Sequence, residues 1–579
     1  MATNVRNLKN PSGDEKPLAI ALGGLGIIWG IVLGGLKLAP LFGGDDQHVP
    51  VNPVALVVGI AKGRVVLGGS EAVSITVLGA VLALVATAVA VQVASRRAQK
   101  KGRAIVPNAK YMASKSDIAS MSGKSTGAAS QRMGLKLGEG AAPGVLLGKE
   151  LRTGQPVYAD YETLLTQLWA ARRGKTSTQV LPQILSAPGG VITSSNKRDT
   201  VDDSLAGRQA VGEVFVFDPQ RIWTKEEPDW FFDPLDFIRR RSVDEWDAAA
   251  TGLARLFRDD AGLSEGNKDM FSEGGQRLVA GWLLAACCEN LPITELVLWA
   301  GAETDKEPVE LLRRHGWHRK ADALQAQYEL TSRTRSGVFA NAQQMVAALE
   351  HEVPGQWVTP SVGKRRFDAD AFIADSQQGG RPTMYLLSKE GPTSASALTL
   401  ALLVTLMDAA EEYGESQPGG RLPVPLVCPL DEAANTVKWG ELANKYSHYG
   451  SRSIIITTIL QSFTQAKRIW GEDSTRDMLT NSCVVYGGGI KDERFLSELS
   501  AFIGDHEEHR TSRSSDGTWG KSSRSTSIAE KRTLTVSELQ ALPFGVMVVI
   551  PQKAAPMLVE SVPWWERDFE PAIAEAMAK

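Results

Sequence analysis

The stretch that decides the fold is "LWAARRGKTSTQVLPQIL", which runs from Leu168 to Leu185. Its centre, Gly174–Thr176, matches the end of a phosphate-binding loop of the form G-x-x-x-x-G-K-[ST]. Trp169 occupies the position of the first glycine, so the match is partial. A strand-like apolar run over Leu164–Trp169 precedes the loop, and a helical pattern over Thr176–Leu185 follows it. A strand, a loop and a helix in this order are the context that a phosphate loop requires.

This loop predicts a nucleotide site. The amino end of a helix offers free N–H groups and a positive dipole end to an anion. Lys175 would reach the β- and γ-phosphates of ATP, and the hydroxyl of Thr176 would hold Mg²⁺. The expected nucleotide-binding residues are Arg173, Gly174, Lys175, Thr176 and Ser177. On this segment alone, a chance Gly-Lys-Thr in a basic turn stays open.

A second motif follows about 255 residues later. The apolar run Val424–Leu430 leads directly into Asp431 and Glu432, which is the arrangement of a Walker B strand. Asp431 would bind Mg²⁺, and Glu432 would orient and deprotonate the attacking water. The alternative is an acidic pair that opens a helix, where its charge suits the helix dipole. The two motifs together, in this order, predict an ATPase.

A third strand-like run, Ser453–Leu460, ends at a polar residue. Gln461 could there sense a γ-phosphate or orient water. Arg452 stands before the run, and we expect it to act as an arginine finger for a neighbouring subunit. The alternatives are a glutamine that caps a helix and an arginine that is simply solvated.

Apolar runs of strand length recur through the chain with helical stretches such as Ala395–Tyr413 between them. The other runs are Gly190–Thr193, Val214–Phe217, Thr383–Leu387, Cys483–Tyr486 and Val546–Ile550. Nearly continuous Val, Ile and Leu are typical of strands buried on both faces of a parallel sheet. The alternation therefore predicts a doubly wound α/β domain.

The pattern also divides the chain into parts. We expect a membrane anchor over 1–103, a linker leading into the domain over 104–150, and a nucleotide-binding domain over 151–233 and 354–579. An all-helical insertion is expected over 234–353, with a buried helix around Leu278–Cys288.

The first hundred residues contain two uncharged segments of membrane-spanning length, Leu18–Leu36 and Ala72–Ser95. Lys and Arg precede the first and follow the second, so both chain ends should be cytoplasmic. This predicts a multi-pass protein of the inner or plasma membrane whose large domain lies in the cytoplasm.

Composition excludes several other classes. The net charge is -3, so contacts with nucleic acid must be local. The four cysteines have no C-x-x-C spacing, which favours a reduced cytosolic setting over disulfides or zinc. His506–His509 is expected to be a solvated loop, and Arg510–Arg532 a loop or hairpin tip.

Three further runs carry a resemblance to a known family. They are "PLVCPLDEAAN" (425–435), "HYGSRSIIITTILQSFTQA" (448–466) and "LTVSELQALPFGVMVVI" (534–550). With the two apolar segments, the loop and the helical insertion, the chain resembles the type IV coupling proteins of conjugation systems, the TraG/TraD-like family, over about residues 15–565.

The resemblance implies a membrane-anchored, RecA-like P-loop ATPase that assembles as a homo-hexamer. Such proteins pump single-stranded DNA, with its attached relaxase, into the subunits of a type IV secretion channel. The resemblance places phosphate binding on Gly174, Lys175 and Thr176, and a sensor role on Gln461. It also implies a polar turn near the nucleotide at Ser194–Asp199 and contact of the helical insertion with relaxosome proteins.

Two rival functions stay open. One is an FtsK-like translocase of double-stranded DNA, and the other is a degenerate ATPase that acts as a membrane receptor or scaffold. Trp169 departs from the motif, since glycine there allows an unusual backbone angle. Either Ala170–Ala171 forms the tight part of the loop, or nucleotide affinity is reduced. Lys175→Ala is expected to abolish nucleotide binding or hydrolysis with little effect on folding, because its side chain would point at phosphate.

Overall fold

The computed structural model describes residues 34, 36–38, 40, 49–65, 106–263, 270–389, 395–515 and 522–578. The chain divides into two units, Met1–Ala104 and Ile105–Lys579. In the first unit, helix α2 spans Pro53–Ala61.

The two predicted membrane spans, Leu18–Leu36 and Ala72–Ser95, lie outside the described residues except at Gly34 and Leu36. Within the described ranges, none of the helices combines the length and the apolar content that crossing a bilayer requires.

The second unit is built on one sheet of 11 strands in the order β2-β1-β15-β14-β11-β3-β10-β9-β4-β8-β5. The strands are β1 Val145–Glu150, β2 Pro156–Ala159, β3 Leu165–Leu168, β4 Val191–Ser195, β5 Val214–Phe217, β8 Thr383–Leu387, β9 Leu426–Leu430, β10 Ile454–Leu460, β11 Cys483–Tyr486, β14 Val546–Ile550 and β15 Met557–Glu560. Seven consecutive strands of this sheet, β11, β3, β10, β9, β4, β8 and β5, run parallel to one another. The other four strands, β2, β1, β15 and β14, extend the sheet with antiparallel pairing.

The parallel strands are buried on both faces, as their composition predicts. Along β10, Ile454 and Ile456 lie in one hydrophobic cluster, and Ile455 and Ile459 lie in the other. Side chains alternate between the two faces of a strand, so each cluster covers one face of the sheet. The prediction of an α/β sheet covered on both faces is confirmed, with the correction that one edge is antiparallel.

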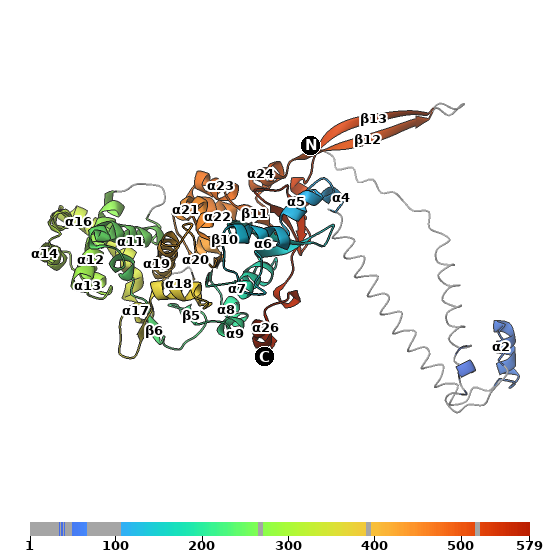
Figure 1. Ribbon diagram of the computed structural model, residues 1–579, viewed down its shortest axis with the longest axis horizontal. Coiled ribbons are helices and arrows are strands. Elements are labelled where there is room, and N and C mark those ends of the chain that lie inside the picture. The colour runs from blue at the N-terminus through green and yellow to red at the C-terminus, as the bar shows by residue number, and fades with distance from the viewer. Residues whose placement is uncertain are drawn as a thin grey trace. The chain divides into compact units, whose positions relative to one another are not determined.

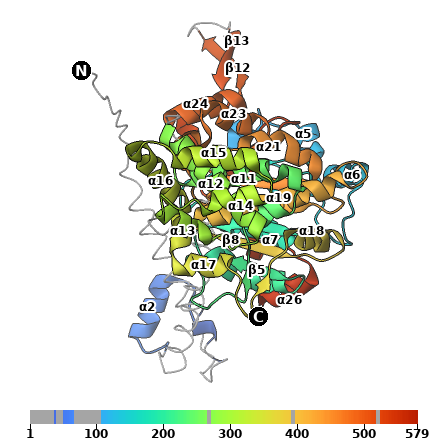
Figure 2. The same cartoon turned by 90° about the vertical axis from the view of Figure 1, so that its left-hand side faces the viewer.

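A block of helices lies between β5 and β8 in the chain and gathers at one end of the unit (Figures 1 and 2). Its helices are α10 Asp236–Arg239, α11 Trp246–Asp260, α12 Met270–Glu289, α13 Glu295–Gly301, α14 Glu307–Arg314, α15 His318–Tyr328, α16 Ser332–Val346, α17 Glu352–Val358 and α18 Ala369–Gln377. Two short strands, β6 Trp230–Phe231 and β7 Arg365–Arg366, pair in parallel beside them. The buried helix expected over Leu278–Cys288 is part of α12, although the boundaries of the insertion stay a prediction.

The segment expected to be a linker, 104–150, requires a correction. It contains helices α4 Val106–Ala109, α5 Lys115–Ser120 and α6 Gly123–Arg132, and its last residues form β1 of the main sheet. Strand β1 pairs with β15 near the carboxyl end of the chain, and helix α26 Pro571–Ala578 follows. The two ends of the second unit therefore complete one sheet.

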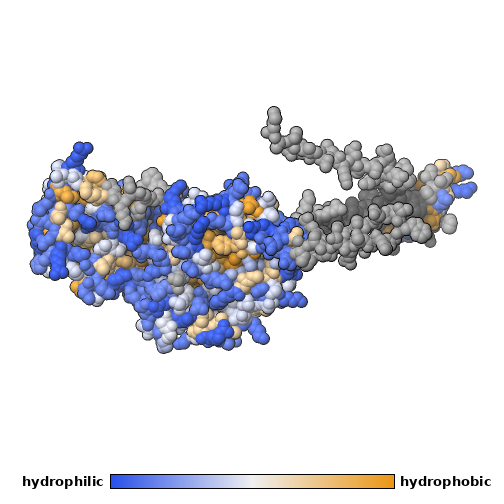
Figure 3. Space-filling view, turned by 90° about the horizontal axis from the view of Figure 1, so that it is seen from above, coloured by the Kyte–Doolittle hydropathy of each residue, from blue (hydrophilic) through white to orange (hydrophobic). Residues whose placement is uncertain are grey.

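The hydrophilic segment after helix α24 (Glu493–Ile503) forms a long hairpin that projects from the body of the unit (Figure 1). Its strands, β12 Asp505–Ser515 and β13 Ser522–Arg532, form a separate antiparallel sheet. The expected solvated loop at His506–His509 is therefore wrong, because these residues belong to β12. Hydrophilic residues dominate the face shown in Figure 3, and apolar residues occur there in small groups.

Candidate nucleotide-binding site

Four neighbouring parallel strands bring the predicted site residues together at their carboxyl ends, which form one edge of the sheet across the strands. Strands β3, β10, β9 and β4 lie side by side in this order. The loop before Lys175 follows β3, Gln461 follows β10, and Asp431 and Glu432 follow β9. Asn196 follows β4. In open α/β sheets, ligands bind outside the carboxyl ends of the strands, and these residues gather there.

The phosphate loop has two residues in the left-handed backbone region, Arg172 with φ 61° and Gly174 with φ 85°. The loop then enters a π-helical turn, Thr176–Val180, which continues as helix α7, Leu181–Ser186. The hydroxyls of Ser177 and Thr178 donate to the Gly174 carbonyl at 3.1 and 2.8 Å. The predicted strand, loop and helix are therefore present.

Trp169 does not adopt the backbone angle for which the motif uses glycine. The left-handed positions lie later in the loop, so a bulky residue fits here without strain. The indole is 1% exposed and donates to Gln167 Oε1 at 2.9 Å. It packs on Gly487, where an added Cβ would lie 1.9 Å from the ring, so only glycine fits beneath it. Trp169 is thus a core anchor of the loop.

Arg173 is held by backbone carbonyls beside the loop. Its Nε donates to the Gly487 carbonyl at 3.2 Å, and Nη2 donates to the Leu542 and Pro543 carbonyls at 2.7 and 3.0 Å. These three contacts tie the loop to the segments that follow β11 and precede β14. They support a role in fixing the loop, and the predicted contact of Arg173 with phosphate stays a prediction.

Lys175 lies between the two predicted carboxylates. Its Nζ is 2.5 Å from Asp431 Oδ1 and 3.1 Å from Glu432 Oε1. All three side chains are buried, with Lys175 6% exposed. Burial raises the pKa of the Asp431 carboxyl, and the charge and hydrogen bond of Lys175 work against this rise. The structure therefore brings together the two motifs that lie about 255 residues apart in the sequence.

Glu432 is fixed from three sides. Its backbone adopts φ 50°, an uncommon conformation for a residue other than glycine, at the point where β9 ends. Besides Lys175, its carboxylate accepts hydrogen bonds from the side-chain amides of Gln461 and Asn196. Asn196 belongs to the polar turn Ser194–Asp199, but neither spacing nor motif singles it out. The family resemblance places this turn near the nucleotide, and only the place of Asn196 after β4, beside β9, could have indicated the residue itself.

The site offers oxygen ligands of the kind that Mg²⁺ prefers. Asp431 supplies a buried carboxylate, and Thr176 supplies a half-buried hydroxyl at the start of the π-helical turn. Ser177 follows on the same turn. These residues fit a hydrated magnesium ion that also binds phosphate oxygens.

Arg452 lies away from this edge, just before β10, whereas Gln461 lies just after it. A strand of seven residues spans roughly 20 Å, so Arg452 could serve only the site of another subunit. It donates to the Gly420 carbonyl and pairs with Glu415, both at 2.7 Å. Its role as an arginine finger stays a prediction.

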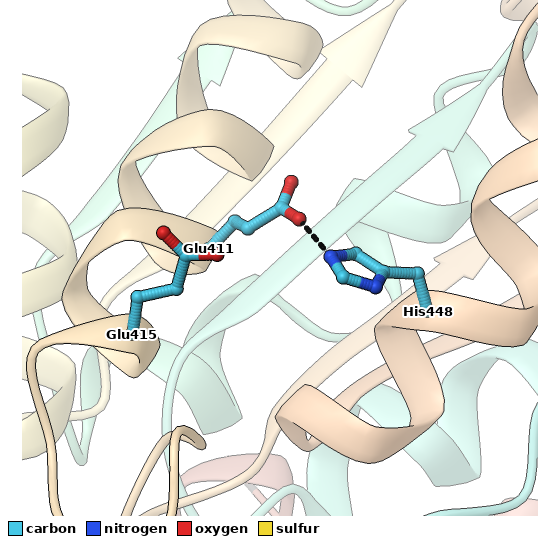
Figure 4. Close-up of side chains that lie close together, drawn as sticks. All are labelled: Glu411, Glu415 and His448. Atoms are coloured by element: carbon cyan, nitrogen blue, oxygen red, sulfur yellow. Dashed lines mark ion pairs between the residues drawn. The ribbon is translucent and has the colours of Figure 1, made fainter.

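Glu415 belongs to a cluster of potential metal ligands with Glu411 and His448 (Figure 4). The two glutamates lie one turn apart on helix α19, Ser396–Glu415, and His448 lies on α21, Leu442–Tyr449. Glu411 already pairs with His448 at 2.5 Å and with Lys445 at 3.2 Å. Lys445 and Arg452 balance the two carboxylates, so we interpret the cluster as an ion-pair network.

Comparisons with known proteins support the sequence resemblance. Residues 425–544 match the family model described as the TraM recognition site of TraD and TraG. This range includes Asp431, Glu432, Arg452 and Gln461. The predicted resemblance to the TraG/TraD-like family is confirmed. A search of curated proteins finds no match to this chain.

Solved structures show the same fold. The unbound bacterial conjugative coupling protein TrwBdeltaN70 is similar with a TM-score of 0.54 and 17% identity, over 77% of this chain and 94% of that chain. The plasmid coupling protein TrwB in complex with ADP and Mg²⁺ gives 0.52 and 16%, over 73% and 91%. Its complex with the non-hydrolysable ATP analogue ADPNP gives 0.51 and 16%, over 77% and 94%.

Proposed function

We propose that this TraG/TraD-like chain is a membrane-anchored P-loop ATPase. It couples single-stranded DNA and its attached relaxase to a type IV secretion channel. The observation that carries the proposal is the placement of Lys175 within 2.5 Å of Asp431 and 3.1 Å of Glu432. Lys175 follows β3 and the two carboxylates follow β9, at the carboxyl ends of parallel strands that have β10 between them. Lys175 also lies directly before a helix whose amino end suits phosphate.

The proposed chemistry assigns one task to each group. Lys175 exchanges its two carboxylate partners for the β- and γ-phosphates of ATP. Asp431 and Thr176 would hold Mg²⁺, and the bound ion would neutralise charge on the phosphate oxygens. Glu432 accepts a proton from the attacking water, while Gln461 and Asn196 hold its carboxylate in place.

The buried position of Asp431 suits this exchange. Burial raises its carboxyl pKa, and Lys175 alone supplies a cation at hydrogen-bond distance among the described residues. When Lys175 turns to phosphate, Asp431 and Thr176 would hold a divalent cation, whose charge would offset that of the Asp431 carboxylate. The complexes of TrwB with ADP and Mg²⁺ and with ADPNP are solved structures of proteins with this fold, which supports ATP and Mg²⁺ as cofactors here.

The transport role rests on the family resemblance. A motor that delivers DNA into a secretion channel must lie at the membrane, and Leu18–Leu36 and Ala72–Ser95 would anchor it there. A homo-hexamer would place Arg452 of one subunit at the site of the next, where it would stabilise the charge of the transition state. Relaxosome proteins and the channel subunits are the expected partners.

The test is Mg²⁺-dependent ATP hydrolysis by the purified full-length chain, with and without single-stranded DNA. We expect hydrolysis that DNA stimulates and that Lys175→Ala removes. Lys149→Ala is a matched control, because Lys149 is an exposed lysine on β1 outside the site. Hydrolysis at the parent rate in Lys175→Ala would place the site elsewhere. A complete lack of nucleotide binding in the parent would favour a receptor or scaffold instead of a motor.

A further inference from the structure

A basic pocket lies between the helical block and the nucleotide-binding edge of the sheet. Its volume is about 520 Å³, which is within the size range of ligand sites. One wall comes from α11 and the turn after it, and the other comes from the segments that follow β9 and β10. The charged residues that line it are Arg255, Arg258, Asp259, Lys438 and Arg468.

Positive charge dominates this basic pocket, with four cations against one carboxylate. Arg255 pairs with Glu441 at 2.7 Å, and Arg258 lies 3.5 Å from Asp259. Arg468 is exposed, and among the described residues no carboxylate lies within ion-pair distance of it. The basic pocket therefore keeps an exposed guanidinium group, that of Arg468, which an anionic ligand can use.

The walls of the basic pocket continue directly from the catalytic groups. Helix α20, Ala433–Thr436, begins immediately after Glu432, and Lys438 follows it. Helix α22, Phe463–Trp470, begins two residues after Gln461 and carries Arg468. The side-chain amide of Gln465 donates to Asn435, which joins the two segments. A ligand held by Lys438 and Arg468 thus bears on Glu432 itself and on Gln461, one of the two amides that position its carboxylate.

We propose that the basic pocket binds the phosphates of a single-stranded DNA and that its occupancy reaches Glu432 through α20 and α22. The inference rests on the proposed function and names the place where its DNA substrate contacts the motor. Arginine and lysine recognise phosphate by charge and by hydrogen bonds from several donors, without reading bases. A motor that moves along any sequence needs contacts of this kind.

Binding is measured by fluorescence anisotropy with a labelled 20-nucleotide oligo-dT and the full-length chain, in the presence of ADP, so that no hydrolysis is required. Each contact to a single strand makes affinity fall as about the inverse 0.7 power of salt concentration. Loss of one contact therefore lowers affinity about fivefold at 0.1 M salt and reduces the salt slope by about 0.7. We expect these losses in Arg468→Ala and in Lys438→Ala, and about 25-fold in the double variant.

Arg333→Ala is the matched control, because Arg333 is an exposed arginine on α16, outside the basic pocket, and should bind DNA as the parent does. DNA binding by the double variant that equals the parent's would overturn the proposal. Displacement of the oligonucleotide by polyglutamate at equal charge concentration would also overturn it, since the pocket would then suit an acidic protein segment. Equal affinity for a 20-base-pair duplex would overturn the single-strand assignment.

The outcome separates this inference from the proposed function. In Arg468→Ala, half-maximal stimulation of hydrolysis by DNA should need about fivefold more DNA than in the parent, whereas Arg333→Ala should be stimulated as the parent is. If the parent binds and hydrolyses ATP, and the double variant is stimulated at the same DNA concentration as the parent, the result contradicts the basic pocket alone. A parent without nucleotide binding contradicts the proposed function, whereas the anisotropy assay still tests the pocket.

Discussion

Replacing Lys175 by the similar but uncharged methionine should destabilise the folded chain. Lys175 contacts two buried carboxylates, Asp431 at 2.5 Å and Glu432 at 3.1 Å. Removal of one partner of a buried ion pair costs about 3–5 kcal/mol, because it leaves uncompensated charge. The motif alone predicts little effect on folding, since it directs the lysine at phosphate, so the structure changes this expectation.

The size of the effect can be worked out for a thermal scan. For the unit Ile105–Lys579, the entropy of unfolding is roughly 1 kcal/mol per kelvin. Lys175→Met should therefore lower Tm by about 3–5 °C at pH 8 without Mg²⁺. Added Mg²⁺ should restore part of the loss, because a divalent cation can replace the ammonium group between the carboxylates.

The loss should depend on pH. Burial raises the folded-state pKa of Asp431 above its unfolded value. Protonation of Asp431 therefore stabilises the folded chain, and this contribution to the free energy of unfolding is fully present at low pH. That stability is lost as the pH rises through the folded pKa. The variant should therefore approach the parent in acid and fall behind it in base, where Asp431 is charged and lacks its lysine.

Two variants and differential scanning fluorimetry test this reasoning. Lys149→Met should keep the parent Tm, because Lys149 is exposed. A triple variant with Lys175→Met, Asp431→Asn and Glu432→Gln should recover most of the loss, since it leaves no unpaired charge. A Lys175→Met protein with the parent Tm at pH 8 and no Mg²⁺ would refute the claim that these carboxylates depend on Lys175.

Three other changes test separate parts of the account. Trp169→Ala should lower Tm by about 3–5 °C in the same scan, because a fully buried indole costs about 3–5 kcal/mol to remove, and an unchanged Tm would contradict its role as anchor. Arg452→Ala should bind ATP normally, but its assembled form should hydrolyse ATP about 10³–10⁵ times more slowly than the assembled parent. The hydrolysis rate is measured over a range of protein concentrations, and a rate equal to the parent's would exclude Arg452 as the arginine finger. A cysteine at Ser114 should resist membrane-impermeant reagents in intact cells, because the chain after the second apolar segment should be cytoplasmic, and labelling would reverse the topology.

The parallel part of the fold could be predicted because its strands are unusually clear in sequence. Val214–Phe217 and Thr383–Leu387 coincide with β5 and β8 residue for residue. Nearly continuous apolar residues indicate strands that have no solvated face. On the antiparallel side of the sheet, Val546–Ile550 also coincides with β14, but β1, β2 and β15 could not be predicted in this way. Strand β1 contains Gly148 and Lys149, and β15 ends in an exposed Glu560, so neither has the composition of a central strand.

The candidate site could be predicted where a motif has a fixed spacing, and not where tertiary contacts decide. Lys175, Asp431 and Glu432 follow strands whose ends meet, so their proximity follows from the parallel order. Arg173 is adjacent to the motif, but the direction of its side chain depends on backbone carbonyls that lie more than 300 residues later in the sequence. Asn196 has no motif of its own, because its role arises from the contact between two neighbouring strand ends.

The most direct test of the central claim is the rate of ATP hydrolysis by Glu432→Gln. Glutamine keeps the shape of the side chain but cannot accept the proton of water. A general base contributes about 10²–10⁴ in rate. We expect the full-length Glu432→Gln chain to bind ATP and Mg²⁺ as the parent does, with turnover lower by this factor in the presence of single-stranded DNA. Turnover at the parent rate would contradict the assignment of Glu432 and, with it, this edge of the sheet as the hydrolysis site.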